Sequence, residues 1–152
     1  MNSFFPQKVA IASDHAAFEL KEELINHFTD IDFVDFGTSS VESMDYPDTG
    51  FEGAEAVANN SCDFGIIMCG SGIGMSIVAN KVKGIRAALC QSKEFAQLSR
   101  KHNNANVLVI PGRFTAKHIA FDIVDAFLKT KFEGGRHQRR IDKITNYETK
   151  KN

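Results

Sequence analysis

Hydrophobic and polar positions along the chain alternate between two kinds of pattern. Short continuous apolar runs predict buried strands, and they cover residues 9–13, 33–36, 64–69, 85–90 and 107–110. Between them, apolar residues at spacings of three and four predict helices over about 17–28, 51–59, 75–82, 92–102 and 115–128. Five such units predict an α/β fold, a three-layer arrangement whose five-stranded, mostly parallel, Rossmann-like sheet has helices on both faces.

Some element boundaries follow from residue type. Ser92 and Thr115 are suited to cap the helices that they precede. Tyr46 and Pro47 lie in a polar stretch that we interpret as a loop before the second helix.

The C-terminal segment has a pattern of its own. Gly134 and Gly135 form a hinge, and Ile141, Ile144 and Tyr147 then recur at helical spacing. We therefore predict a single α/β domain over residues 1–130 and a C-terminal arm helix within residues 131–152. A short amphipathic helix outside the domain needs a surface to cover, and a second subunit would provide one.

Composition places the chain among ordinary globular proteins. Its 152 residues suit one domain with one core, and 43% of them are hydrophobic. No apolar run approaches a membrane span, and the first residues lack the apolar stretch of a signal peptide, so we expect a cytoplasmic protein without membrane contact. Cys62, Cys69 and Cys90 form no CxxC pair and are expected to be free thiols. The five histidines lack metal-ligand spacing, so no metal is expected.

Charge is unevenly distributed. Residues 129–152 hold eight Lys and Arg against three Asp and Glu, a net +5 in a chain whose total is −1. A basic tail could bind nucleic acid or an anionic ligand, or be merely solvated. After the Gly134-Gly135 pair, Tyr147 is the one aromatic residue among these basic residues that would suit base stacking, so we expect no nucleic-acid partner.

A glycine-rich run separates the third predicted strand from its helix, and it reads Cys69-Gly70-Ser71-Gly72-Ile73-Gly74. Free backbone N–H groups and the positive end of a helix bind anions and favour a thiolate. The run lacks the GxGxxG of dinucleotide sites, the Gly-Lys-Ser/Thr of a Walker loop, and the arginine of thiol phosphatases. A buried structural cysteine on a tight turn is the alternative interpretation.

In a parallel α/β fold, ligands bind beyond the carboxyl ends of the strands. This rule predicts that Asp14, His15, Tyr46 and Arg113 lie beside the glycine-rich run, at the rim formed by the carboxyl ends of the strands. Asp14 could equally be a helix cap, and His15 an ordinary surface residue.

Three further residues are candidates on different grounds. His102 stands at a predicted helix C-terminus, where the negative end of the helix dipole favours a protonated imidazole. Such a residue could be a helix cap or a proton donor. Arg136 and Arg140 share one helix face and could be solvated charge or a phosphate clamp.

Together these motifs resemble the ribose-5-phosphate isomerase type B family, which includes sugar-phosphate isomerases of the lactose and allose pathways. The resemblance runs from about Lys8 to the C-terminus. Its matching pieces are Ser13-Asp14-His15, Asp45-Tyr46-Pro47, Cys69 to Gly74, Ser76 to Lys81, Gly84 to Ala87, Gln97 to Asn103, and Glu133 to Gln138.

The resemblance implies an isomerase of ribose 5-phosphate and ribulose 5-phosphate that works through an enediol without metal or cofactor. Cys69 would move the proton between C1 and C2, and His102 would open the furanose ring. Gly70, Ser71, Gly72, Ile73 and Gly74 would stabilise the enediolate through their amides. The other implied sugar and phosphate contacts are Asp14, His15, Tyr46, Asn103, Arg113, Arg136 and Arg140.

The resemblance also implies a homodimer whose sites are shared, because the family places its C-terminal arm on a neighbouring subunit. Some members use a Glu just after the glycine loop as the base, and Met75 stands there in this chain, so it resembles the cysteine type. Two rival hypotheses remain open: an isomerase of allose or galactose 6-phosphate, and a non-catalytic phosphate- or nucleotide-binding module.

Overall fold

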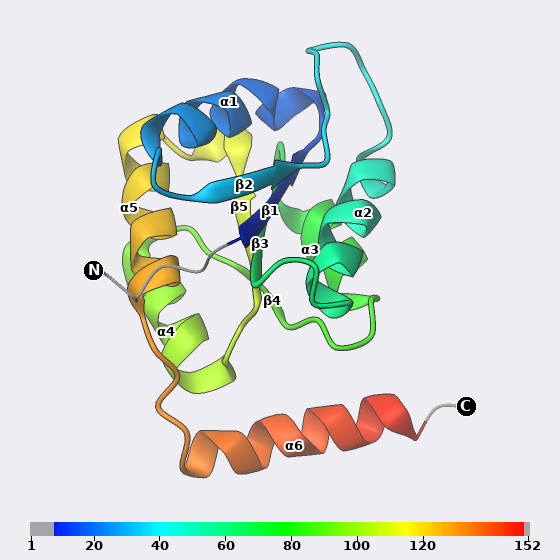
Figure 1. Ribbon diagram of the computed structural model, residues 1–152, viewed down its shortest axis with the longest axis vertical. Coiled ribbons are helices and arrows are strands. Elements are labelled where there is room, and N and C mark those ends of the chain that lie inside the picture. Colours follow the sequence, from blue (N-terminus) through cyan, green and yellow to red (C-terminus); the bar gives the residue numbers. More distant parts are fainter. Residues whose placement is uncertain (1–7, 151–152) are drawn as a thin grey trace.

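The computed structural model describes residues 8–150, and within them the strands form one parallel sheet in the order β2-β1-β3-β5-β4 (Figure 1). The strands are β1 (Lys8–Ser13), β2 (Asp32–Asp35), β3 (Phe64–Cys69), β4 (Ala87–Leu89) and β5 (Val107–Pro111). The helices are α1 (Phe18–His27), α2 (Tyr46–Ala58), α3 (Ile73–Asn80), α4 (Lys93–Asn103), α5 (Lys117–Lys129) and α6 (Arg136–Thr149), with short 3₁₀ turns at His15–Ala17 and Gly112–Phe114. The predicted α/β fold is confirmed.

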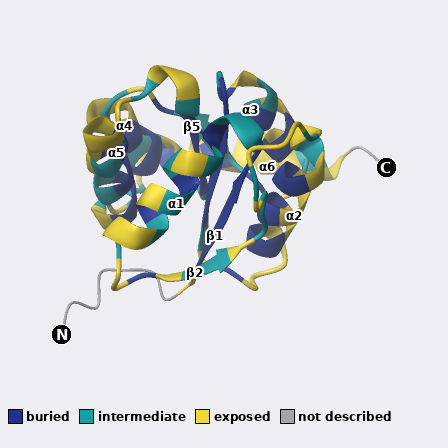
Figure 2. Ribbon diagram, turned by 90° about the horizontal axis from the view of Figure 1, so that it is seen from above, coloured by how far each residue is buried: buried dark blue, intermediate teal, exposed yellow. Residues whose placement is uncertain are grey.

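Helices cover both faces of the sheet, which makes three layers (Figure 2). On one face α1, α4 and α5 pack over a core that includes Leu24, Ala96 and Phe127. On the other face α2 and α3 pack over a second core that includes Val57 and Met75. The central strands β1, β3 and β5 are buried on both sides, which explains their continuous apolar runs.

The topology creates a crevice between β1 and β3. These strands are neighbours, but the chain leaves β1 towards α1 on one face and leaves β3 towards α3 on the other. Loops that separate in this way leave space beyond the carboxyl ends of the two strands, and ligands of open α/β sheets bind there.

Three predicted boundaries were wrong. Tyr46 and Pro47 do not lie in a loop, because α2 begins at Tyr46 with a proline in its first turn, where proline costs no hydrogen bond. Thr115 does not cap α5; its hydroxyl donates to the Pro111 carbonyl at 2.7 Å, and Ala116 occupies the cap position. The predicted strand over residues 85–90 is shorter, Ala87–Leu89. By contrast, Ser92 caps α4 by accepting a hydrogen bond from the Phe95 amide.

The helix α6 lies below the amino ends of the strands (Figure 1). Gly134 and Gly135 adopt positive φ angles of 69° and 57° and redirect the chain after α5. Ile141 is buried, whereas Ile144 and Tyr147 of the same helix are 55% and 65% exposed. The predicted domain (1–130) and arm (131–152) include residues 1–7 and 151–152, which lie outside the described residues. Docking of the arm on a second subunit stays a prediction.

None of the helices within residues 8–150 combines the length and apolar character needed to cross a membrane.

Candidate active site

Cys69 is the last residue of β3, and the loop after it is held rigidly. Gly72 caps α3 with a φ of 73°, and the Ser71 hydroxyl accepts a hydrogen bond from the Ile73 amide at 3.2 Å. A Cβ at Gly72 would lie 2.5 Å from Leu89 Cδ1 and 3.2 Å from the Pro111 backbone nitrogen. Glycine is therefore required here by both backbone angle and space.

The other glycines bring two predicted side chains to the loop. A Cβ on Gly74 would meet the Tyr46 ring at 2.6 Å, so the ring lies directly against the first turn of α3. Arg113 lies over Gly70, with its Cδ 3.2 Å from a Cβ built there, and its amide donates to the Gly70 carbonyl at 3.0 Å. Tyr46 and Arg113 therefore flank the glycine loop, as predicted from the carboxyl-end rule.

Asp14 and His15 directly follow β1 and lie at the same rim, the edge formed by the carboxyl ends of the strands. The Asp14 amide donates to the carbonyl of Met68, the residue before Cys69, at 3.1 Å. Its carboxylate also accepts a hydrogen bond from the Ala17 amide, so the predicted cap is present, and the residue is 7% exposed. His15 Nδ1 accepts a hydrogen bond from the Met44 amide at 3.2 Å, which orients the ring and leaves Nε2 as the nitrogen available to a ligand.

The three cysteines are free thiols in different surroundings. Burial raises the pKa of Cys62, and it raises the pKa of Cys90 to about 11, so both remain protonated at neutral pH. Cys69 ends β3, and the glycine loop and the α3 N-terminus follow it. Cys90 follows β4 in a similar way, but its thiol donates a hydrogen bond to the Ala88 carbonyl at 3.6 Å and burial keeps it protonated. The position of Cys69 makes it the candidate for thiol chemistry.

A second group of predicted site residues lies at the opposite edge of the sheet. His102 and Asn103 end α4, and the Asn103 carbonyl accepts a hydrogen bond at 3.0 Å from Arg86, which directly precedes β4. The length of β5 separates this edge from the Cys69 rim, roughly 13 Å at a rise of about 3.3 Å per residue. His102 is therefore far from Cys69 of its own chain.

Arg136 and Arg140 lie on α6 at this same edge, and both are exposed. The structure thus brings the predicted residues together in two groups. The rim group contains Asp14, His15, Tyr46, residues 69–74 and Arg113, whereas the arm group contains His102, Asn103, Arg136 and Arg140.

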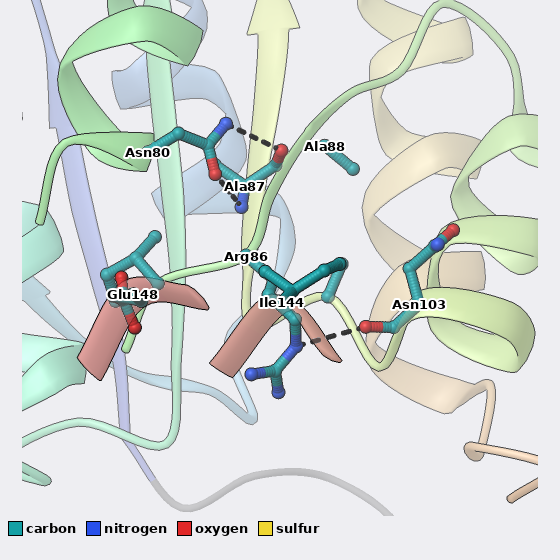
Figure 3. A pocket seen from close by; sticks show the side chains of 9 residues that line it. Asn80, Arg86, Ala87, Ala88, Asn103, Ile144 and Glu148 are labelled. Carbon is teal, nitrogen blue, oxygen red and sulfur yellow. Dashed lines mark hydrogen bonds between the residues drawn. The ribbon is translucent and has the colours of Figure 1, made fainter. Parts of the chain in front are cut away.

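A cavity of about 420 Å³ lies beside the arm group, between α6 and the start of β4 (Figure 3). Asn103, Arg86, Ile144 and Glu148 are among the residues that line it. The Glu148 carboxylate accepts a hydrogen bond from the Gly84 amide at 3.1 Å and ties the end of α6 to the domain. The arm edge is therefore a hollowed surface that combines apolar residues, such as Ile85 and Ile144, with several polar groups.

Two histidines stack within the arm group. The rings of His102 and His137 are 4.3 Å apart and nearly parallel, at 13°. Burial is the main cause that lowers the pKa of His137, and His102 and Arg136 lower it further, while the Glu133 carboxylate opposes the shift. His137 is therefore expected to be neutral near pH 7.

This shift predicts a pH dependence of stability. The unfolded chain takes up a proton on His137 near pH 6.5, before the folded protein does, so the free energy of unfolding should fall as the pH drops from about 7.5 to 5. Urea unfolding across this range should show a smaller fall for His137→Gln than for the wild type. Replacement of the exposed His118 by Gln serves as the control, and an equal pH dependence in all three proteins would contradict the assignment.

Sequence reasoning gave no role to three residues that organise the arm group. Arg86, Glu133 and His137 all fall inside motifs of the family resemblance, which was the available signal. Their partners are distant in sequence, because His102 stacks on His137 and Arg86 bonds to Asn103 only after the chain has folded.

Comparisons with known proteins agree with this architecture. The sequence model of the Ribose/Galactose Isomerase family matches residues 9–144. Ribose-5-phosphate isomerase B of Escherichia coli strain K12 is 45% identical over 148 residues, which cover 96% of this chain and 99% of that protein.

Two solved structures are similar throughout. Ribose-5-phosphate isomerase B of Clostridium thermocellum superposes with a TM-score of 0.94 at 47% identity, covering 96% of this chain and 100% of that chain. The Mycoplasma genitalium enzyme, solved with bound ribulose 5-phosphate, gives a TM-score of 0.90 at 47% identity, covering 93% of this chain and 96% of that chain. From the matching sequence, fold and loop geometry, the chain belongs to the Ribose/Galactose Isomerase family.

Proposed function

We propose that this chain is an aldose–ketose isomerase that interconverts ribose 5-phosphate and ribulose 5-phosphate through ring opening and an enediolate. The observation that carries the proposal is the rigid glycine loop, which puts the Cys69 thiol and the amides of the α3 N-terminus at the crevice between β1 and β3. The Mycoplasma genitalium relative with bound ribulose 5-phosphate supports a sugar phosphate as the ligand.

The proton transfer needs a base and a way to hold negative charge. Cys69 as thiolate takes the proton from the carbon next to the carbonyl and returns it to the neighbouring carbon. Among the amides of residues 70–74, that of Ile73 donates to the Ser71 hydroxyl, and the others donate hydrogen bonds to the enediolate oxygen, whose charge grows in the transition state. Asp14 and Tyr46 line the same rim and hold the sugar hydroxyl groups.

The arm group completes the site from a second copy of the chain. His102, proposed to open the furanose ring, lies at the wrong edge of its own sheet to reach the sugar above Cys69. In a two-fold dimer, the rim of one subunit faces the arm group of the other, twice over. Ile73 and Ile77, which are 58% and 57% exposed beside the glycine loop, supply apolar surface for such an interface.

Phosphate binding is divided in the same way. His15 and Arg113 contact the phosphate from the rim of one subunit. Arg136 and Arg140 contact it from α6 of the second subunit, whose Asn103 binds the sugar. A clamp at the end of the substrate remote from the reaction supplies binding energy that positions the reacting carbons.

The proposed reaction belongs to carbohydrate metabolism, in the pentose phosphate pathway. Its substrates are charged sugar phosphates of intracellular metabolism, which supports the predicted cytoplasmic location. Isomerisation of allose or galactose 6-phosphate is the second candidate, because one additional carbon can fit without changing the chemistry at Cys69.

The test is turnover by the purified protein in EDTA, with ribose 5-phosphate and allose 6-phosphate assayed in parallel. We expect ribose 5-phosphate to be the better substrate by kcat/KM, with kcat in the ordinary enzymatic range of about 1–1000 s⁻¹. Preference for the hexose phosphate would keep the mechanism and change the pathway. Tight binding of ribose 5-phosphate without turnover would contradict the proposal and favour the binding module.

A further inference from the structure

Three side chains that bind transition metals meet where the arm joins the domain. His102 lies in the last turn of α4, His137 in the first turn of α6, and Glu133 just before the Gly134-Gly135 hinge. Their ligand atoms all lie within 4.8 Å of one another. The Glu133 amide donates to the Lys101 carbonyl at 3.1 Å, so the segment that carries the carboxylate is fixed to α4.

One of these groups is buried without a partner. The His137 side chain is 7% exposed, and its Nε2 has no hydrogen bond. Glu133 Oε2 lies 3.6 Å from this nitrogen, which is too long for a hydrogen bond. A buried polar atom left unpaired costs free energy and calls for an explanation in a folded protein. The nitrogen faces the carboxylate across a gap that an ion would bridge.

The chemistry of the three ligands selects the ion. Two imidazoles and a carboxylate suit zinc and similar transition-metal dications, whereas calcium and magnesium prefer oxygen ligands throughout. Two ligands of a tetrahedral zinc ion at about 2.1 Å are about 3.4 Å apart, and the His137–Glu133 pair is already at 3.6 Å.

Binding requires a movement of His102. Its ring is parallel to that of His137, so its nitrogen must turn out of the stack to face the same ion. His102 is only half-buried and lies at a helix end, which leaves room for the turn. Arg136 and Arg140 are positive neighbours of His137, so the affinity should be weaker than that of a structural zinc site.

We propose that His102, Glu133 and His137 form a binding site for a zinc-type dication, and that the bound ion inhibits the isomerase. Inhibition follows because the ion occupies the His102 nitrogen that would exchange a proton with the sugar ring oxygen. The metal site rests on the geometry alone, whereas the inhibition rests on the proposed function.

The site is tested first by binding, without substrate. Protein freed of metal with EDTA and then dialysed is titrated with Co²⁺ and Zn²⁺, in the Cys69→Ala background so that the loop thiol contributes no ligand. We expect one ion per chain, visible Co²⁺ bands of a nitrogen and oxygen site, and displacement of Co²⁺ by Zn²⁺. A thiolate-to-cobalt charge-transfer band as the sole signal would overturn the proposal.

Glu133→Gln is the decisive variant, because Glu133 is exposed and the substitution keeps the backbone hydrogen bond to Lys101, so we expect an intact fold. It should weaken zinc binding at least about tenfold. Asp142→Asn is the matched control on α6. Asp142 is an exposed carboxylate that accepts a hydrogen bond from Gln138 and lies outside the three-residue cluster. Equal zinc affinity in both variants, or no binding up to millimolar zinc, would overturn the site.

Inhibition is then measured with Cys69 intact. Zinc should inhibit wild-type turnover at the concentration that fills the site, compete with the sugar phosphate, and lose potency in Glu133→Gln but not in Asp142→Asn. Binding without inhibition would overturn the inhibitory part and leave the site standing. A protein that binds zinc but turns over no sugar phosphate would refute the proposed function and not the metal site.

Discussion

Replacement of Cys69 by alanine is expected to lower kcat for ribose 5-phosphate by about a thousandfold or more, because a positioned base contributes roughly 10²–10⁴ to proton transfer and no other thiol can take its place. Cys62 and Cys90 are buried elsewhere, and burial raises the pKa of each. The dissociation constant for ribulose 5-phosphate should change only a few-fold, since the phosphate contacts remain. Steady-state kinetics and calorimetric binding measure the two quantities.

Cys62→Ala is the matched control, because it removes a buried thiol from the same core as Cys69 without touching the crevice. It should keep nearly all activity at a temperature well below unfolding. Turnover by Cys69→Ala within tenfold of the wild type would remove Cys69 from the role of base, and loss of ligand binding with it would indicate a collapsed loop instead.

A mixture of two inactive variants is expected to regain activity. Cys69→Ala spoils the rim group and leaves the arm group intact, whereas His102→Ala does the reverse. When the subunits exchange, each mixed dimer contains one site built from an intact rim and an intact arm. Random pairing should therefore restore about a quarter of the wild-type activity, from a background near zero, for a two-fold dimer with shared sites.

The double variant Cys69→Ala/His102→Ala provides the control, because mixing it with either single variant creates no intact site. Exchange is verified by native mass spectrometry of subunits that differ in a tag. Complete exchange without recovered activity would mean that each chain builds its site alone, and the proposed shared site would be wrong. Activity of His102→Ala before mixing would remove His102 from the site.

Local signals carried most of the fold. The apolar run ending at Cys69 and the glycines after it identified β3 and its loop, because burial on both faces and positive φ angles select those residue types directly. The start of α2 was missed since a proline after a polar stretch resembles a loop as much as a first helical turn. Thr115 was misassigned because its hydroxyl found the Pro111 carbonyl instead of an amide.

The division of the site into two groups was only partly readable from the sequence. His102 stands a few residues before a predicted strand, and residues that precede a parallel strand lie at the amino edge, so its distance from Cys69 could have been inferred. The stacking of His102 on His137 could not, because the two lie on separate helices and no periodic pattern links them.

The residues that contact Gly72 and Gly74 differ in how easily they can move to accommodate a larger side chain. At Gly72 any side chain would press on the backbone of Pro111, which cannot withdraw without disturbing β5. At Gly74 the obstacle is the Tyr46 ring, which is 40% exposed and can swing aside. Directed evolution towards a longer sugar should therefore accumulate substitutions around Tyr46 and leave Gly72 invariant, so that chain-length preference diverges while the proton-transfer machinery is inherited unchanged.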